Sequence, residues 1–152
     1  MMQQTYYSTN MTPQLQNGFN GGIWKNLEEA VRCAIPHNDT LYIVTGASFT
    51  KGGAEEPVKM IVNRNDGKSL PVPNYYWKVV MKVRRLEGKP VEACAVGFWM
   101  PHSDLKGHDY AEFAVSVDQI EDWTGFDFYV HLEDSLEKKA EAQSDWESFR
   151  RF

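Results

Sequence analysis

Four polar residues near the start of the chain have side chains suited to binding a metal ion and a phosphate group. Residues 7–32, YSTNMTPQLQNGFNGGIWKNLEEAVR, contain Asn10, Asn20, Glu28 and Arg32. Amide and carboxylate oxygens are ligands for hard cations such as Mg²⁺, Mn²⁺ and Ca²⁺. A guanidinium group binds phosphate oxygens through its charge and its paired N–H donors. The segment therefore predicts a site for a hard metal ion beside a phosphate.

Asn20 is expected just before a helix, where its amide oxygen can point into a cleft. A neutral ligand at this place leaves most of the coordination shell to water and substrate phosphate, as is usual for a catalytic Mg²⁺. An asparagine before a helix is also typical of a helix cap or a turn. The residue alone therefore leaves two alternatives, a metal ligand and a structural cap.

Glu28 and Arg32 follow Asn20 at positions that share one side of a helix. Glu28 falls on the apolar stripe that runs from Trp24 through Val31, where an acid is costly unless it is paired or faces a cavity. On one interpretation, Glu28 and Arg32 form an ordinary i,i+4 ion pair. On the other, Glu28 holds a water of the metal and Arg32 contacts phosphate oxygens. Asn10 is either a residue that orders its loop or a substrate contact.

The elements that must position these residues are predicted by periodicity and by turn residues. In the first half we expect a loop at 17–22, a helix at 24–35, a buried strand at 40–46, a short strand at 58–62 and a turn at 63–69. In the second half we expect a hairpin of strands at 75–83 and 91–100, and then a capped helix at 116–124. A last strand or extended piece is expected at 126–132. The expected fold class is α+β, with a twisted, mostly antiparallel sheet. Residues 1–132 are expected to form the main domain, and 133–152 a helical tail that is either docked or frayed.

Composition sets broad limits. A chain of 152 residues is long enough for one domain with a real core, and its net charge of −5 does not indicate nucleic-acid binding by the whole surface, although a local basic cleft remains compatible. We expect no membrane span, since no run of about twenty apolar residues exists. The polar start at residues 1–5 shows no secretion signal, and the compartment stays unknown. Cys33 and Cys94 are either buried thiols or a disulfide.

Residues 7–32 resemble the second half of the active-site motif of the DNA/RNA non-specific endonucleases, a family of the ββα-metal (His-Me finger) superfamily. The family pattern is roughly S-N-[IM]-x-P-Q followed by N-x-G-x-W-x-x-L-E-x-x-x-R. The chain has TNMTPQ at 9–14 and NGGIWKNLE at 20–28, with Arg32 four residues later. Further matches, in order, are YIVTG at 42–46, VPNYYWKV at 72–79, FWMP at 98–101 and the segment 115–128. The likeness extends over about residues 6–132.

This resemblance implies a Mg²⁺-dependent endonuclease with a ββα-metal type active-site helix. It implies that Asn20 is the sole direct protein ligand of the metal, that Glu28 holds metal-bound water, that Arg32 contacts the phosphate and that Asn10 supports the site. The metal would offset the charge that builds on the leaving 3′ oxygen. DNA and RNA would both be substrates, because such enzymes recognise backbone phosphates. Family members are often secreted, periplasmic or organellar.

The chain departs from the family pattern in one respect. The family's nucleophilic water is activated by a histidine of an upstream D-R-G-H motif, which this sequence lacks. The four histidines all follow the motif and are each typical of a solvated surface residue: His37, His102, His108 and His131. Losing a general base costs about 10²–10⁴ in rate.

Three hypotheses follow from this departure. In the first, the chain is the C-terminal part of a nuclease, weakly active or inactive alone, whose partner is the missing N-terminal part or a second copy. In the second, it is a degenerate module that still binds metal or nucleic acid. In the third, it is a structural or interaction domain in which the polar site is a relic.

Overall fold

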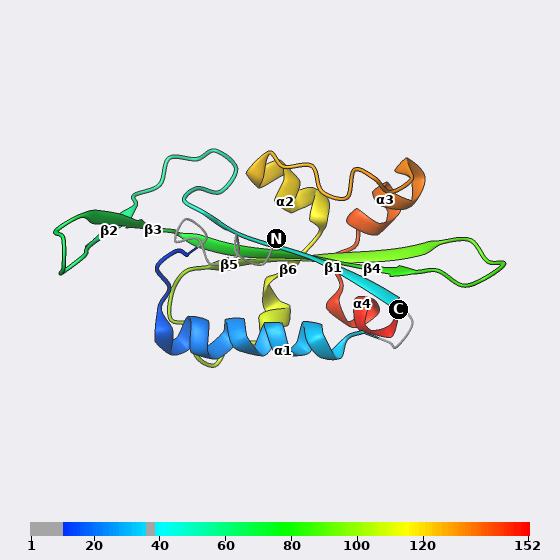
Figure 1. Ribbon diagram of the computed structural model, residues 1–152, viewed down its shortest axis with the longest axis horizontal. Coiled ribbons are helices and arrows are strands. Elements are labelled where there is room, and N and C mark those ends of the chain that lie inside the picture. The colour runs from blue at the N-terminus through cyan, green and yellow to red at the C-terminus, as the bar shows by residue number, and fades with distance from the viewer. Residues whose placement is uncertain (1–10, 36–38) are drawn as a thin grey trace.

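A four-stranded antiparallel sheet separates two layers of helices in the computed structural model, which describes residues 11–35 and 39–152 (Figure 1). The strand order is β1-β4-β5-β6, and these strands are β1 (Asp39–Ser48), β4 (Tyr75–Arg84), β5 (Glu92–Pro101) and β6 (Ala114–Val115). A separate hairpin consists of β2 (Lys59–Val62) and β3 (Ser69–Val72). The expected α+β class with a mostly antiparallel sheet is therefore confirmed.

Helices cover both faces of the sheet. One face carries the helical run η3 (Gln16–Trp24) and α1 (Lys25–Cys33), together with η4 (Tyr110–Phe113) and α4 (Trp146–Arg151). The other face carries α2 (Val117–Thr124) and α3 (Asp134–Glu141). No helix within the described residues is long and apolar enough to cross a membrane.

The central strands β4 and β5 are buried because alternate side chains enter two separate apolar layers. Tyr76 and Val80 of β4 belong to the layer that contains α1, whereas Trp77 and Val79 belong to the layer that contains α2. Both faces of the hairpin formed by β4 and β5 are thus covered, so the sequence of these two strands is an almost unbroken apolar run. The strands expected at 75–83 and 91–100 are confirmed for this reason.

The segment 17–22, which we expected to be a loop before the helix, is an irregular stretch, and the regular helix α1 begins only at Lys25. Asn17, Gly18 and Gly22 have non-helical backbone angles, and Gly18 has a positive φ of 76°. The N–H of Asn20 donates to the carbonyl of Leu15 at 2.9 Å, which closes a wide five-residue turn. Phe19, in the middle of this stretch, is fully buried and anchors it to the core.

Residues 133–152 are docked on the sheet. Trp146 and Phe149 of α4 are 3% and 0% exposed and belong to the same apolar layer as α1. The buried ammonium of Lys82 donates a hydrogen bond to the carbonyl of Phe149 at 2.7 Å. Of the two alternatives for the tail, docked or frayed, the structure has the docked one.

Two strand expectations need correction. The strand expected to be buried at 40–46 is the edge strand β1, where Tyr42 and Ile43 are 41% and 47% exposed, because no strand of the described residues pairs with its outer edge. For residues 126–132, expected to be a last strand or an extended piece, the structure excludes only the strand, and Tyr129 has a positive φ of 59° there. Their apolar side chains instead cap the layer that contains α2.

The two cysteines are free thiols in different environments. Cys33 is exposed at the end of α1, whereas Cys94 is buried in β5, where its Sγ lies 2.8 Å from Oε1 of Gln143. The disulfide alternative is therefore wrong, and the expectation of a buried thiol holds for Cys94 alone. Burial raises the pKa of Cys94 to about 11, with Lys82 opposing the shift, so the group stays protonated at neutral pH.

Candidate active site

Asn20, Glu28 and Arg32 lie along one helical run that packs across the sheet. Asn20 is in the π-type turn of η3, and Glu28 and Arg32 are in the first and last turns of α1. Asn20 and Arg32 are exposed and Glu28 is half-buried. Asn10 lies outside the described residues. Asn20 thus lies before the regular helix α1 that carries Glu28 and Arg32.

The backbone between Asn20 and Glu28 is not one regular helix. Gly22 has non-helical φ and ψ of −118° and −112°, and α1 begins at Lys25. Asn20 therefore lies in an irregular turn before the helix that carries Glu28 and Arg32. Wide turns of this kind are frequent at functional sites.

Glu28 and Arg32 do not form the i,i+4 ion pair that we considered as one interpretation. Within the described residues, the ion pair on α1 joins Lys25 to Glu29, with 3.6 Å between Nζ and Oε1. No described hydrogen bond engages the side chain of Asn20, Glu28 or Arg32. Within the described part of the chain, these three side chains thus have no hydrogen-bond or ion-pair partner.

Lys78 belongs to this site, although sequence reasoning assigned it no role. Its side chain is 5% exposed, its Nζ donates to Oγ1 of Thr45 at 2.7 Å, and it lies 4.8 Å from the ring centroid of Trp24. Burial lowers the pKa of Lys78, the charge of Arg32 lowers it further, and the charge of Glu28 opposes the shift. A lysine in a run of apolar strand residues was the available signal, since such a residue is rarely buried without a purpose.

An aromatic cluster fixes the helical run to the sheet. The ring centroids of Phe19 and Tyr76 lie 5.3 Å apart, and His102 lies 5.0 Å from each. Nε2 of His102 accepts a hydrogen bond from the N–H of Leu15 at 2.8 Å, and Nδ1 donates to the carbonyl of Pro73 at 2.9 Å. The expectation that His102 is a solvated surface residue is therefore wrong, because both ring nitrogens are hydrogen-bonded and together tie Leu15, the N-cap of η3, to Pro73 before β4.

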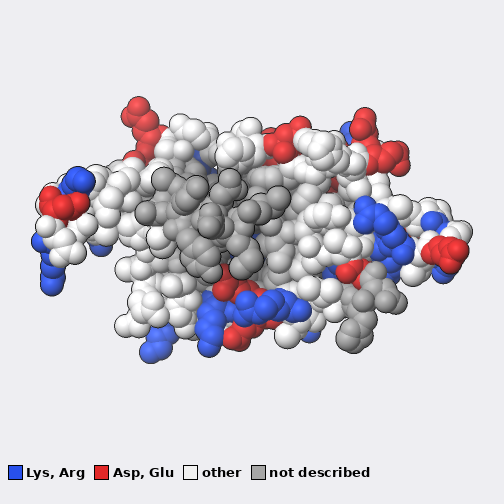
Figure 2. All heavy atoms as spheres, viewed as in Figure 1, with Lys and Arg blue, Asp and Glu red and all other residues white. Residues whose placement is uncertain are grey.

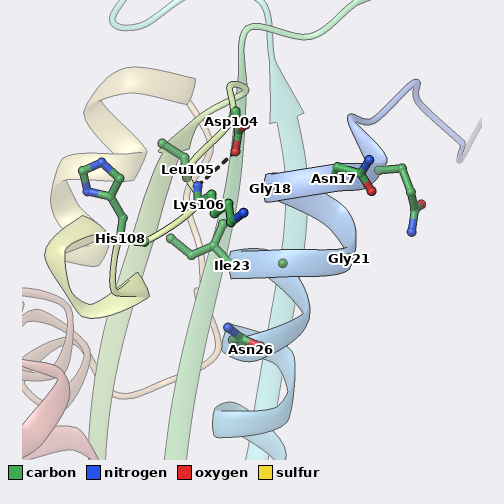
Figure 3. Close-up of a pocket in the computed structure, with 12 residues that line it drawn as sticks. Asn17, Gly18, Gly21, Ile23, Asn26, Asp104, Leu105, Lys106 and His108 are labelled. Carbon is green, nitrogen blue, oxygen red and sulfur yellow. Dashed lines mark hydrogen bonds between the residues drawn. The ribbon is translucent and has the colours of Figure 1, made fainter.

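An open cavity lies beside η3, and its wall does not include Asn20, Glu28 or Arg32. It has a volume of about 590 Å³ and is bounded by η3 and the loop after β5, with Asn17, Asn26, Asp104 and His108 in its wall (Figure 3). Asp104 accepts a hydrogen bond from the N–H of Lys106 at 3.1 Å, which closes the loop on itself.

The surface over α1 carries both charge signs. Figure 2 shows basic and acidic side chains together along the lower edge of the view, where Figure 1 places α1. The helix supplies Lys25 and Arg32 as well as Glu28 and Glu29. A mixed surface of this kind can hold a cation and an anion next to each other, which a purely basic patch would not do.

The donor set is compatible with a hard divalent ion. Asn20 offers a neutral amide oxygen, and Glu28 offers a carboxylate half-buried on the same run. Two such oxygens leave most of the shell to water and substrate, which matches the way Mg²⁺ is usually held. Arg32, one turn further on, is suited to a phosphate oxygen.

Residues 1–135 match the family model of the DNA/RNA non-specific endonucleases, and the chain belongs to this family. It is 30% identical over 145 residues to a nuclease of Nostoc sp., an alignment that covers 93% of this chain and 48% of the relative. It is 29% identical over 133 residues to a nuclease of Serratia marcescens, covering 86% and 46% of the two chains. The chain thus spans about half the length of these relatives.

A solved structure of the EndoG/EndoGI complex shares the fold. The match has a TM-score of 0.61 at 22% identity and covers 88% of this chain and 54% of the other. The mitochondrial endonuclease G of Caenorhabditis elegans is 25% identical over 135 residues. The α+β architecture described above is therefore that of a nuclease fold.

Proposed function

We propose that this chain provides the metal-binding and phosphate-binding side of the active site of a non-specific endonuclease that acts on DNA and RNA. Asn20 is the proposed ligand of Mg²⁺, with Mn²⁺ or Ca²⁺ as alternative ions, and Glu28 holds a metal-bound water. Arg32 binds the phosphate, and Asn10 supports the site. The proposal depends on one observation in a chain of this family: Asn20, Glu28 and Arg32 lie on the helical run of η3 and α1. None of the three side chains takes part in a hydrogen bond or ion pair among the described residues.

The residues of the chain have separate roles in this proposal. When bound, the metal ion supplies positive charge that stabilises the leaving oxygen of the phosphodiester. Arg32 orients the phosphate through its guanidinium N–H groups. Lys78, buried beneath the helix, adds a fixed positive charge without contacting bulk water. Substrate recognition then depends on backbone phosphates and not on base edges.

We do not assign the general base, which would activate the attacking water, to any of the described histidines. Both ring nitrogens of His102 are occupied, and His108 pairs with Glu112 at 2.9 Å in the wall of the separate cavity. The sequence contains no D-R-G-H motif. We therefore propose that these 152 residues bind metal and nucleic acid but hydrolyse slowly by themselves, since a missing base costs about 10²–10⁴ in rate.

Metal binding and nucleic-acid binding by the purified chain test this proposal. Isothermal titration with Mn²⁺ should detect one binding event that Asn20→Ala abolishes without affecting ions bound elsewhere, whereas Asn26→Ala, an exposed asparagine on α1, should leave that event unchanged. Plasmid nicking in Mg²⁺ should be weak and should stop in EDTA. Equal Mn²⁺ affinity in the Asn20 and Asn26 variants would refute the ligand assignment, and fast nicking by pure protein would show that another residue acts as the base.

A binding module without hydrolysis is the second candidate, and the missing D-R-G-H motif favours it. In that case a labelled oligonucleotide should bind in a Mg²⁺-dependent way while no cleavage accumulates. Addition of imidazole, which can act as a small external base, separates the two candidates. Rescue of cleavage indicates an endonuclease site that lacks its base, and no rescue indicates a binding module.

A further partner of the chain is also proposed, at the outer edge of β1. No strand in the described part of the chain pairs with that edge, and Tyr42 and Ile43 are exposed along it. Open strand edges attract additional strands. We propose that a second copy, or another part of an endonuclease, adds a strand there. Light scattering should show self-association that Ile43→Lys reduces and that Val62→Lys, on the exposed β2, does not.

A further inference from the structure

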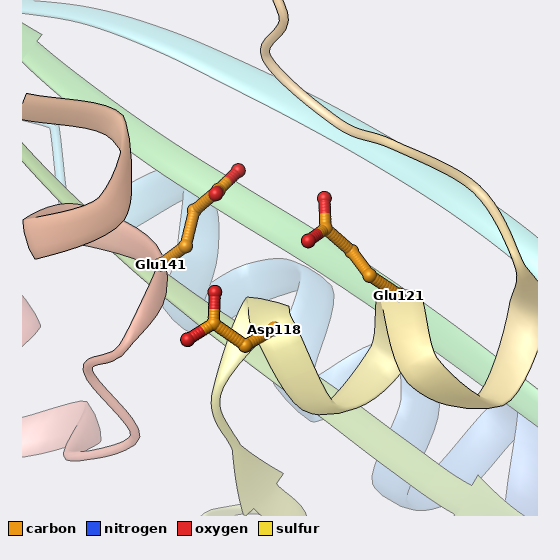
Figure 4. A group of neighbouring side chains, drawn as sticks. All are labelled: Asp118, Glu121 and Glu141. Carbon is orange, nitrogen blue, oxygen red and sulfur yellow. The ribbon is translucent and has the colours of Figure 1, made fainter. Parts of the chain in front are cut away.

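Three carboxylates meet on the face of the sheet opposite α1. Asp118 and Glu121 project from α2, and Glu141 projects from the end of α3. One ligand oxygen from each lies within 4.8 Å of the other two. Figure 4 shows the three carboxyl groups converging on the gap between the two helices.

Glu141 has no partner that explains its position. It is 6% exposed, and its Oε1 is buried with no hydrogen bond among the described residues. A buried carboxylate without a partner is costly. Its carboxyl group lies near those of Asp118 and Glu121 (Figure 4). A ligand held between the three carboxyl groups would satisfy the buried oxygen.

The charged groups that shift the pKa of Glu141 are all acidic. Burial, followed by the charges of Glu121, Glu137, Asp118 and Asp127, raises the pKa of Glu141 to about 8. Burial and neighbouring acids likewise raise the pKa of Glu121. Among the described ion pairs, none joins Lys138 or Lys139 of α3 to Glu141.

We propose that Asp118, Glu121 and Glu141 bind a hard divalent cation, with Ca²⁺ as the preferred ion, and that this ion fastens α3 to α2. Two oxygens bound to one Ca²⁺ at about 2.3–2.6 Å are separated by no more than about 5 Å, which the observed spacing satisfies. Asp118 is exposed and Glu121 half-buried, so the ion and its waters reach the site from solvent. One oxygen of Glu121 is already oriented by the N–H of Phe128 at 2.7 Å.

This cation site is independent of the proposed active site. The helices α2 and α3 cover one face of the sheet, and α1 covers the other (Figure 1). The proposed role is structural, because an ion that binds the folded chain and not the unfolded chain stabilises the fold by mass action. The ion should stabilise residues 133–152 more than the rest of the chain, because α3 precedes α4 directly in this tail.

Thermal unfolding of the full chain during Ca²⁺ titration tests the inference. The experiment is carried out on the Asn20→Ala background, so that the proposed catalytic metal does not contribute. Ca²⁺ should raise the melting temperature in a saturable way, and Glu141→Gln and Asp118→Asn should each weaken the apparent affinity by at least about tenfold. Asp122→Asn, an exposed acid on α2 outside the group, is the matched control and should respond as the parent does.

The variants also separate ion binding from folding defects. Without Ca²⁺ at pH 8, Glu141→Gln should be at least as stable as the parent, because the substitution removes a repelled charge. Asp118→Asn changes an exposed residue, so its folding is not at risk. Absence of a saturable Ca²⁺ response in the parent, or an equal response in both ligand variants, would overturn the inference and leave a shared proton as the occupant of the site.

Discussion

The ammonium group of Lys78 donates a hydrogen bond to Oγ1 of Thr45 at 2.7 Å and thereby joins the centre of the sheet to its edge strand. The pair lies directly beneath the helical run, since Lys78 also packs against the ring of Trp24. The charges of Glu28 and Arg32 both act on it. Lys78 is thus a fixed positive charge at the floor of the proposed active site.

Replacing Lys78 with Met should separate charge from packing. A buried charge that is exchanged for an apolar side chain of similar volume often leaves stability unchanged or improved. We therefore expect an unchanged or higher free energy of unfolding, but severalfold weaker oligonucleotide binding at low salt, measured by fluorescence anisotropy. Lys138→Met, on the opposite face, is the control. Equal affinity in both variants would exclude a role for Lys78 in binding.

Protonation of His102 should loosen the helical run at acidic pH. Burial lowers the pKa of His102 below 6.5, and the neutral ring accepts the N–H of Leu15. The unfolded chain therefore binds the proton more readily than the folded chain, so stability is fully present above about pH 6.5 and decreases as pH falls below that value. Urea unfolding at pH 7.5 and pH 5 should show this loss.

The contribution of His102 can be isolated by substitution. His102→Gln should be less stable at pH 7.5 and should lose less stability on acidification than the parent. His131→Gln changes an exposed histidine and should leave the pH dependence intact. A pH dependence that is identical in the parent and in His102→Gln would show that other groups cause it.

Gly46 of the YIVTG segment is required by close packing against Trp77. A Cβ at Gly46 would lie 2.1 Å from an atom of the Trp77 ring, and that ring is 4% exposed and cannot move aside freely. Gly46→Ala should therefore destabilise the fold by about 1–3 kcal/mol. In a Trp77→Leu background the same change should cost much less, and an equal cost in both backgrounds would contradict the packing explanation.

Much of the fold was predictable because strong local signals agreed with the tertiary structure. The hairpin of β4 and β5 is an apolar run with a clear turn, and Ser116 does cap α2 by accepting the N–H of Gln119. Gly125, in the left-handed conformation, ends that helix as expected. These elements combine local preference with burial, so one sequence pattern predicts both.

The errors have a common physical cause, which is that long-range packing decided the outcome. The strand at 40–46 was taken for a buried strand because its sequence does not show that only one of its edges pairs within the described residues. His102 was taken for a surface residue because its two hydrogen-bond partners, Leu15 and Pro73, are not its neighbours in the chain. Sequence periodicity carries no information on such contacts.

The candidate site was predictable only in part. The spacing of Glu28 and Arg32 predicted that they share one side of a helix that follows Asn20, and the structure has both residues in α1, with Asn20 in the preceding turn. Lys78 could not be assigned, because its proximity to Glu28 depends on how α1 crosses β4. The carboxylates of Asp118 and Glu141 come from separate helices and were indistinguishable from ordinary surface acids.

Phe149 tests whether the tail is an integral part of the domain. Its side chain is fully buried, and its carbonyl accepts the hydrogen bond of Lys82, so removal of the ring leaves a cavity beside a buried ammonium group. Phe149→Ala should lower the free energy of unfolding by about 3–5 kcal/mol, measured by urea denaturation. Phe126→Ala, where the ring is 58% exposed, should have a far smaller effect. Equal and small losses in the two variants would mean that residues 133–152 detach without disturbing the sheet.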